Sequence, residues 1–129
     1  MPRRPRATDL LTISKTLDLP IEAVTETFGV VGIRGSGKTT TTKVLAEELV
    51  AHGQQACIID PLGAYWGLRS SPDGKAPGLP VLVLGGEHGD APLDTARAEV
   101  LADFVVETTV SVVFDLSQVS KSEPSWLLW

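Results

Sequence analysis

The stretch Gly32-Ile33-Arg34-Gly35-Ser36-Gly37-Lys38-Thr39 decides the fold of this 129-residue chain. It has the form G-x-x-x-x-G-K-[ST], which is the phosphate-binding P-loop. An apolar run, residues 28–33, leads into it, and a helical pattern, residues 39–52, leads out of it. A strand before the loop and a helix after it are the setting in which this motif holds phosphate. The sequence therefore predicts a strand–loop–helix unit that binds a nucleotide.

The residue types of the loop match this chemistry. Backbone N–H groups can surround a phosphate if the chain curls tightly, and glycine permits the necessary angles. The next helix offers unpaired N–H groups and the positive end of its dipole. Lys38 adds a full charge for the β- and γ-phosphates, and the Thr39 hydroxyl is an oxygen ligand suited to Mg²⁺. The predicted nucleotide-binding residues are Gly32, Arg34, Gly35, Ser36, Gly37, Lys38, Thr39 and Thr40.

Composition bounds the other properties of the chain. Its length fits one domain, and 43% apolar residues is typical of a globular protein. Three of the eleven basic residues are Arg3, Arg4 and Arg6, so residues 7–129 carry eight basic and sixteen acidic residues, a net charge of −8. Residues 7–129 therefore lack the net positive charge that is typical of a nucleic-acid-binding domain. No membrane span or signal peptide is recognisable, and with one cysteine there is no disulfide framework, so we expect a cytoplasmic protein.

The remaining pattern predicts a mostly parallel α/β sheet with flanking helices. Strands are expected at 27–33, 55–60, 80–84 and 110–116, and helices at 39–52 and 93–107. The run at 27–33 is nearly continuously apolar, as in a strand covered on both faces. In the first helix, Val44, Leu45 and Leu49 form the apolar stripe, and Gly53 ends the helix. The order β-α-β-β-α-β favours parallel pairing. Residues 9–18 contain alternating apolar residues, and residues 19–21 read as an extended lead-in; we expect this segment to pack on the sheet edge or beside the nucleotide base.

Two acidic residues at strand ends are candidates for the metal site. Nucleotide hydrolysis requires an acid near Mg²⁺, and Asp115 follows an apolar strand as such an acid does. However, Leu116 follows it where many ATPases place Glu, so Asp115 is either a catalytic, metal-holding residue or the cap of the next turn. Asp60, at the end of the second strand, has either a functional or a structural role. It orients Mg²⁺ through water or touches a neighbouring subunit, or it caps the turn at Pro61–Gly63.

Three further features have simpler interpretations. Trp66, beside Arg69, either stacks on a base or partner or packs within the chain. The segment 85–91 carries Glu87, His88 and Asp90 without a metal-ligand spacing, and we interpret it as a polar turn. Cys57 is expected to be a small buried hydrophobe inside its strand.

These segments together resemble the HerA-like bacterial P-loop ATPases of the HerA/FtsK branch. The P-loop is unspecific, so the resemblance rests mainly on DPLGAYWGLRSS (60–71) and GGEHGD (85–90), with support from the lead-in LDLPIEAVTETF (17–28) and from VVFDLS (112–117). It implies an ATPase that uses ATP and Mg²⁺, forms a homo-oligomer, often a hexamer, moves or remodels DNA, and often works beside a nuclease. It also implies that residues 32–40 form the phosphate and Mg²⁺ site.

The end of the chain departs from that pattern. The family places an acidic Asp-Glu strand after a further helix, whereas Pro124 would break such a helix here. We therefore expect a basic tail at 1–8, the N-terminal part of a nucleotide-binding domain at 9–121, and an atypical, truncated or frame-shifted end at 122–129, with little turnover by the chain alone. The alternatives are a small P-loop kinase and a non-catalytic nucleotide-binding remnant. The absence of an Asn-Lys-x-Asp guanine signature favours ATP.

Overall fold

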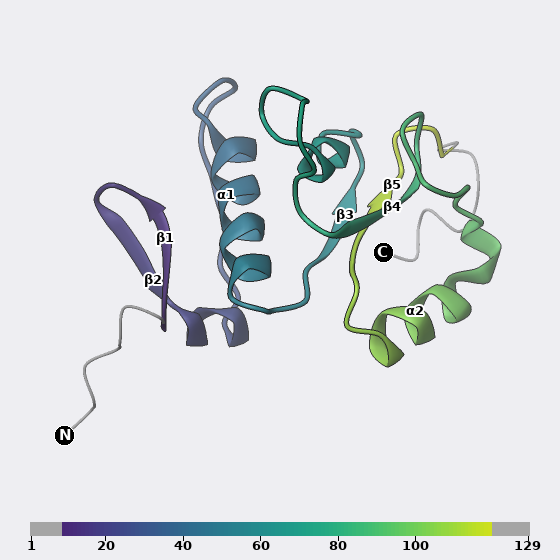
Figure 1. The fold of residues 1–129 in the computed structure, drawn as a ribbon, viewed down its shortest axis with the longest axis horizontal. Coiled ribbons are helices and arrows are strands. Elements are labelled where there is room, and N and C mark those ends of the chain that lie inside the picture. Colours follow the sequence, from purple (N-terminus) through teal and green to yellow (C-terminus); the bar gives the residue numbers. More distant parts are fainter. Residues whose placement is uncertain (1–8, 120–129) are drawn as a thin grey trace. The chain divides into compact units, whose positions relative to one another are not determined.

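The computed structural model describes residues 9–119, and the predicted tail and atypical end lie outside this range. The chain divides after Gln54 into two compact units, which are described separately. The first unit contains strands β1 (Leu10–Ser14) and β2 (Leu17–Pro20) and helix α1 (Lys38–Ala51). The second contains β3 (Cys57–Asp60), β4 (Val81–Gly85), α2 (Ala98–Glu107) and β5 (Ser111–Asp115) (Figure 1).

In the first unit, an antiparallel hairpin packs on α1. Strands β1 and β2 pair with an irregularity between Thr12 and Ser14, and Leu11 is completely buried. The Thr12 backbone N–H donates to Glu48 of α1 at 2.9 Å. The lead-in segment is therefore a hairpin fixed to the helix, and Glu48 is an acceptor for it instead of a freely solvated charge.

Helix α1 confirms the predicted helix and its end. It covers 38–51, and Gly53 follows with φ +74°, the left-handed conformation that ends many helices. The predicted stripe of Val44, Leu45 and Leu49 is half-buried, and Ala46 is the buried residue of the helix.

The predicted strand at 27–33 is wrong. These residues form no regular element and pair with neither sheet. Val31 is 92% exposed and Ile33 is 83% exposed. A strand is stabilised by hydrogen bonds to a neighbour and by burial of its faces. Within residues 9–119 this run pairs with no strand, and Val31 and Ile33 are almost uncovered.

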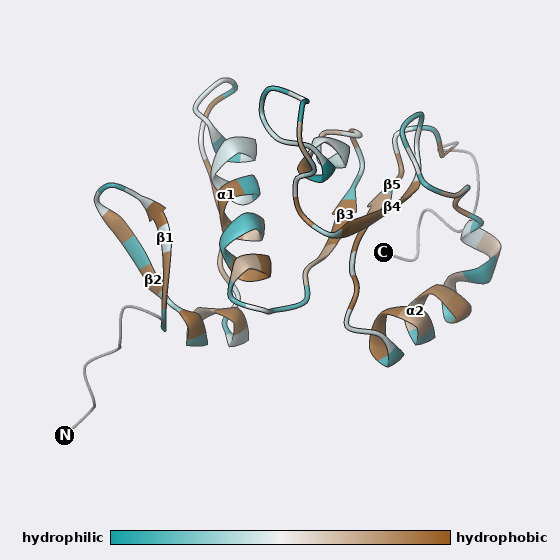
Figure 2. Ribbon diagram, viewed as in Figure 1, coloured by the Kyte–Doolittle hydropathy of each residue, from teal (hydrophilic) through white to brown (hydrophobic). Residues whose placement is uncertain are grey.

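In the second unit, three parallel strands lie in the order β3-β5-β4. Strand β5 is the central one, and all five of its residues, 111–115, are buried. One face of the sheet packs on α2 through Leu84, Val112 and Phe114. Figure 2 shows the corresponding concentration of apolar residues on β4, β5 and α2. The parallel α/β sheet is thus confirmed for these strands.

The second helix begins later than predicted. A 3₁₀ turn, Thr95–Arg97, precedes α2, and the Asp94 side chain caps this turn by accepting from the Ala96 N–H at 3.1 Å. Val100 in the first turn of α2, although apolar, is 62% exposed. Within residues 9–119, no helix combines the length and the apolar character that crossing a bilayer requires.

Candidate functional site

The glycines of the loop at 32–37 adopt the conformations that the motif requires. Gly35 has φ +80° and Gly37 has φ +90°, a region that side chains disfavour. Gly32 is needed for a different reason, because a Cβ there would lie 2.5 Å from Ser36 Oγ. A turn closes the loop, with the Ser36 N–H donating to the Ile33 carbonyl at 3.2 Å. The loop therefore curls tightly at the positions that the sequence predicted.

Lys38 reaches back from the first residue of α1 to the beginning of the loop. Its Nζ donates to the carbonyls of Gly32 and Ile33, each at 2.7 Å. The side chain spans five to six residues of sequence and brings a positive charge beside the loop. Both bonds go to neutral carbonyl oxygens, and bonds to charged oxygens such as those of phosphate are roughly twice as strong. The phosphate oxygens of a bound nucleotide would therefore compete with these two carbonyls for the Lys38 ammonium.

The N-terminus of α1 is chemically open to an anion. Its N-cap is Gly37, which has no side chain to accept from the first N–H groups. No acidic residue lies in the first turn. The first helical N–H groups lack intrahelical acceptors by geometry, and here no carboxylate neutralises the dipole. The helix start thus provides donors and positive potential at the same place as Lys38.

The threonines at 39–42 divide into two pairs. Thr41 Oγ1 donates to the Gly37 carbonyl at 3.1 Å, and Thr42 Oγ1 lies within hydrogen-bond distance of the carbonyls of Lys38 and Thr39. Thr39 and Thr40 are exposed, and no hydrogen bond engages their hydroxyls within residues 9–119. The Thr39 oxygen is therefore available as a hard ligand, which fits the predicted Mg²⁺. Arg34 and Ser36 are exposed as well.

In the second unit, Asp60 and Asp115 end neighbouring strands at the same edge of the sheet. They are paired in register, and they are 1% and 2% exposed. Both oxygens of Asp60 are used within the next turn: Oδ1 accepts from the Leu62 N–H at 3.2 Å and Oδ2 from the Tyr65 N–H at 2.8 Å. This geometry is that of the turn cap, the simpler of the two interpretations of Asp60.

Asp115 differs from Asp60 in its hydrogen bonding. Its Oδ1 accepts from the Ser117 N–H at 2.9 Å, while Oδ2 accepts no hydrogen bond from residues 9–119. Two glycines enclose this carboxylate: a Cβ at Gly63 would lie 3.2 Å from Oδ2, and one at Gly86 would overlap it. Asp115 therefore caps a turn with one oxygen, and its other oxygen accepts no hydrogen bond from the described residues.

The two segments that carry the family resemblance pack against each other. Arg69, in the 3₁₀ helix Trp66–Arg69, forms an ion pair with Asp90 and donates to the His88 carbonyl at 2.6 Å. The ring of Trp66 stacks on that of His88, with centroids 3.9 Å apart. Asp90 also accepts from the Val83 N–H at 2.8 Å. Trp66 thus packs within the chain, and the polar turn is fixed to β4 and to this short helix.

Cys57 is exposed, contrary to the prediction of a buried residue. The reason is sheet order, because β3 is an edge strand. Apolar neighbours nevertheless desolvate the thiol in part, and this raises the pKa of Cys57 above the usual range of a cysteine.

The structure assembles the predicted residues 32–40 in one loop and Asp60 with Asp115 at one sheet edge. The loop belongs to the first unit and the acids to the second. Within residues 9–119, no cluster of three or more His, Cys, Asp or Glu side chains has a metal-binding arrangement. The roles of these residues in nucleotide and Mg²⁺ binding stay predictions. Sequence reasoning missed the glycines that shape the Asp115 site, although Gly85-Gly86 directly after a strand was a visible signal.

Comparison with known proteins gives one match. A family model described as "Helicase HerA, central domain" matches residues 10–123. This range includes the loop, both acidic strand ends and the two packed segments. Neither the curated proteins nor the solved structures gave a match.

Proposed function

The chain belongs to the family of the helicase HerA central domain, and from this premise we propose that it binds ATP with Mg²⁺ through residues 32–40. We further propose that it is the nucleotide-binding part of a DNA-translocating, helicase-type ATPase. The observation that carries the proposal is the position of Lys38. Its ammonium lies beside a tight glycine loop and an uncapped helix start, so that three sources of positive potential act on one small volume.

Each residue of the loop has a stated task in this proposal. The backbone N–H groups of the loop and of the first turn of α1 donate to the phosphate oxygens. Lys38 exchanges its two carbonyl acceptors for oxygens of the β- and γ-phosphates. Arg34 and Ser36, exposed on the loop, add side-chain donors. Thr39 Oγ1 would ligate Mg²⁺, which supplies neutralisation of the phosphate charge when it is bound.

Asp115 is the proposed acidic partner. Its Oδ2 is the carboxylate oxygen that the adjacent turn does not use. Asp60 has both oxygens engaged in its own turn, which makes it the weaker candidate. We propose little turnover by this chain alone, and turnover coupled to DNA in a complete homo-oligomer, with a nuclease partner and a cytoplasmic location. The net charge of −8 over residues 7–129 means that DNA contact depends on local basic groups.

A small P-loop kinase is the less favoured alternative. Such kinases hold the transferred phosphate with arginines beyond the loop, and the sequence has two there, Arg69 and Arg97. Arg69 pairs with Asp90, and Arg97 pairs with Asp94 at 3.2 Å. Both arginines thus already have carboxylate partners.

Calorimetric titration of the 129-residue chain with Mg-ATP tests the binding step. We expect a dissociation constant in the micromolar range. Lys38→Ala should weaken binding by about 10- to 100-fold, because a charge-assisted hydrogen bond contributes roughly 1.5–3 kcal/mol. Lys43→Ala, on the same helix but outside the loop, is the matched control and should bind normally. Equal binding by the Lys38 and Lys43 variants would exclude the loop as the site.

Turnover separates the remaining possibilities. We expect phosphate release by the isolated chain to stay near background, and DNA to stimulate it only in a reconstituted oligomer. Strong turnover that Asp115→Asn abolishes would show that Asp115 completes the site without further chain. A phosphorylated small-molecule product would favour the kinase.

A further inference from the structure

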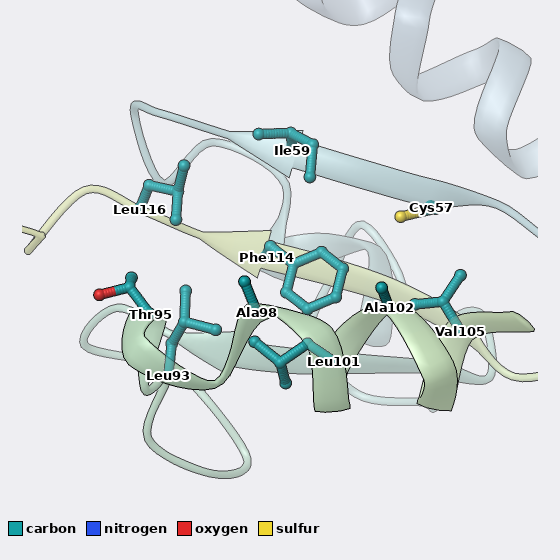
Figure 3. Close-up of a pocket in the computed structure, with 10 residues that line it drawn as sticks. All are labelled: Cys57, Ile59, Leu93, Thr95, Ala98, Leu101, Ala102, Val105, Phe114 and Leu116. Atoms are coloured by element: carbon teal, nitrogen blue, oxygen red, sulfur yellow. The ribbon is translucent and has the colours of Figure 1, made fainter. Parts of the chain in front are cut away.

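An apolar groove lies between the second helix and the edge strand of the parallel sheet. It has a volume of about 180 Å³ and lies entirely within the second unit. Cys57 and Ile59 of β3 form one wall, Ala98 and Ala102 of α2 the other, and Phe114 of β5 lies between them (Figure 3). The groove is separate from the residues proposed to bind nucleotide.

The groove exists because the helix leaves the edge strand uncovered. Ala98 and Ala102 lie one turn apart on the side of α2 that faces the groove, opposite Cys57 and Ile59 of β3, and their side chains are short (Figure 3). As a result Ile59 is 44% exposed, although β-branched residues at such positions are normally covered. Exposed apolar surface of this kind marks a place where another apolar group packs.

Size and chemistry restrict the occupant. An engineered apolar cavity of about 150 Å³ stays dry and binds benzene, so a groove of 180 Å³ has room for an aromatic side chain. Apart from Thr95, the lining side chains are aliphatic, aromatic or sulfur-containing. An aromatic ring with an apolar neighbour fits this surface, whereas a charged segment does not.

The sequence places such a group within reach. Trp126-Leu127-Leu128-Trp129 is an apolar run outside the described residues, and it contains two of the three tryptophans of the chain. Leu116 lines the groove, and Trp126 follows it by ten residues. Ten residues span at most roughly 33–36 Å when extended. We propose that residues 126–129 dock in this groove, with a tryptophan side chain between β3 and α2.

A tether favours this occupant over a second copy of the chain. A short linker holds its end at an effective concentration in the millimolar range, well above that of a typical protein solution. The segment that links Leu116 to Trp126 contains Pro124, which an extended linker tolerates. Docking of this segment is therefore independent of protein concentration, whereas docking of a second copy is not.

Cys57, the sole cysteine of the chain, allows a direct test. Its thiol lines the groove, so a docked tail should shield it from 5,5′-dithiobis(2-nitrobenzoate). A tail that covers the groove for all but a tenth of the time slows the reaction about tenfold. The double variant Trp126→Ser/Trp129→Ser should restore the fast rate. Trp66→Phe is the matched control, because it removes a tryptophan outside the groove and should leave the rate slow.

Two results of that experiment would overturn the proposal. One is an equal rate in the intact chain and the double tail variant. The other is shielding that increases with protein concentration, which would assign the groove to a second copy. Circular dichroism of the tail variant verifies that a fast rate does not come from unfolding.

A second measurement does not depend on the tail variant. In the Trp66→Phe background, the emission comes from Trp126 and Trp129 alone. We expect blue-shifted emission that acrylamide quenches weakly. Adding Cys57→Glu, which places a charge on the groove wall, should shift the emission to the red, and Cys57→Ala should not. Solvent-exposed emission in the Trp66→Phe protein would contradict the docking.

Discussion

Three glycines of the second unit allow backbone strain to be separated from steric exclusion. Gly74, Gly63 and Gly86 have φ values of +69°, +69° and +66°. They differ in what an added Cβ would meet. At Gly74 nothing lies within 4 Å, at Gly63 the nearest atom is Ser117 Oγ at 3.0 Å, and at Gly86 the Cβ would overlap the Asp115 carboxylate. Alanine substitution at the three positions is therefore a graded test of how tightly Asp115 is enclosed.

The structure sets the expected losses of unfolding free energy. All three variants share the cost of a left-handed side-chain residue, roughly 1–2 kcal/mol, reduced by about 0.4–1 kcal/mol because alanine restricts the unfolded chain. Gly74→Ala should therefore cost about 1 kcal/mol. In Gly86→Ala the carboxylate must also move and loosen its bond from the Ser117 N–H, which adds roughly 1.5–3 kcal/mol. Gly63→Ala should lie between them, because its contact is tight but does not overlap.

Urea unfolding followed by circular dichroism measures these differences. A double-mutant cycle with Asp115→Ala then isolates the contact, since that substitution removes the atoms that the new Cβ would meet. We expect Gly86→Ala and Asp115→Ala to be coupled by about 1–3 kcal/mol, and Gly74→Ala and Asp115→Ala to be additive. Equal costs at Gly74 and Gly86, or additivity of Gly86→Ala with Asp115→Ala, would refute the enclosed geometry on which the proposed ligand role of Asp115 depends.

Three other outcomes follow from single contacts. Gln55 Nε2 lies within hydrogen-bond distance of the carbonyls of Val105, Thr108 and Val110, at the end of α2 and just before β5. Gln55→Ala should therefore cost roughly 0.5–1.5 kcal/mol in urea unfolding, against little for Gln54→Ala, whose side chain makes none of these bonds. The Ser71 hydroxyl, more than the Lys75 N–H, holds the pKa of Asp73 below its usual range; Ser71→Ala should raise it in an NMR titration. The pKa of Asp73 is lowered in the folded state, so ionised Asp73 stabilises the fold at pH above the usual Asp range. This stabilisation is lost as the pH falls through the folded pKa, and the Ser71→Ala variant should therefore lose less stability on acidification. Arg69→Ala should speed hydrogen exchange in residues 85–91, whereas Arg97→Ala should not.

Elements whose signal is local were predictable from the sequence. Helix α1 combines a continuous helical pattern with a terminal glycine, and β5 is an apolar run that ends in a polar residue. The bends of the loop were predictable too, because the motif needs glycine at the positions where the chain has positive φ. In these cases short-range sterics and burial favour the same conformation.

Features that depend on the neighbours of a segment were not predictable. Residues 28–33 have the composition of a buried strand, but an apolar run becomes a strand only when another strand pairs with it. Cys57 lies in a strand as predicted, yet it is exposed because β3 is at the edge of the sheet. Strand order is a property of the tertiary fold, and no pattern within residues 55–60 encodes it.

In the candidate site, too, local features were predictable from the sequence and contacts between distant segments were not. The loop residues were identified because they are consecutive, whereas the ion pair of Arg69 with Asp90 joins residues 21 positions apart. The stacking of Trp66 on His88 likewise needs two segments to meet. The sequence indicated each segment as distinctive but contained no sign that they pack together.

The two buried aspartates show how residues of one type at one sheet edge acquire different chemistry. Asp60 directs both oxygens to N–H groups of its own turn, so its charge is satisfied within the fold. Asp115 has one such bond, and glycines at 63 and 86 keep side chains away from its second oxygen. Of the two aspartates, only Asp115 has a carboxylate oxygen that accepts no hydrogen bond from residues 9–119, and both of these glycines have positive φ. That arrangement, more than the position of Asp115 at a strand end, supports the proposal that Asp115 and not Asp60 is the acidic partner of the nucleotide site.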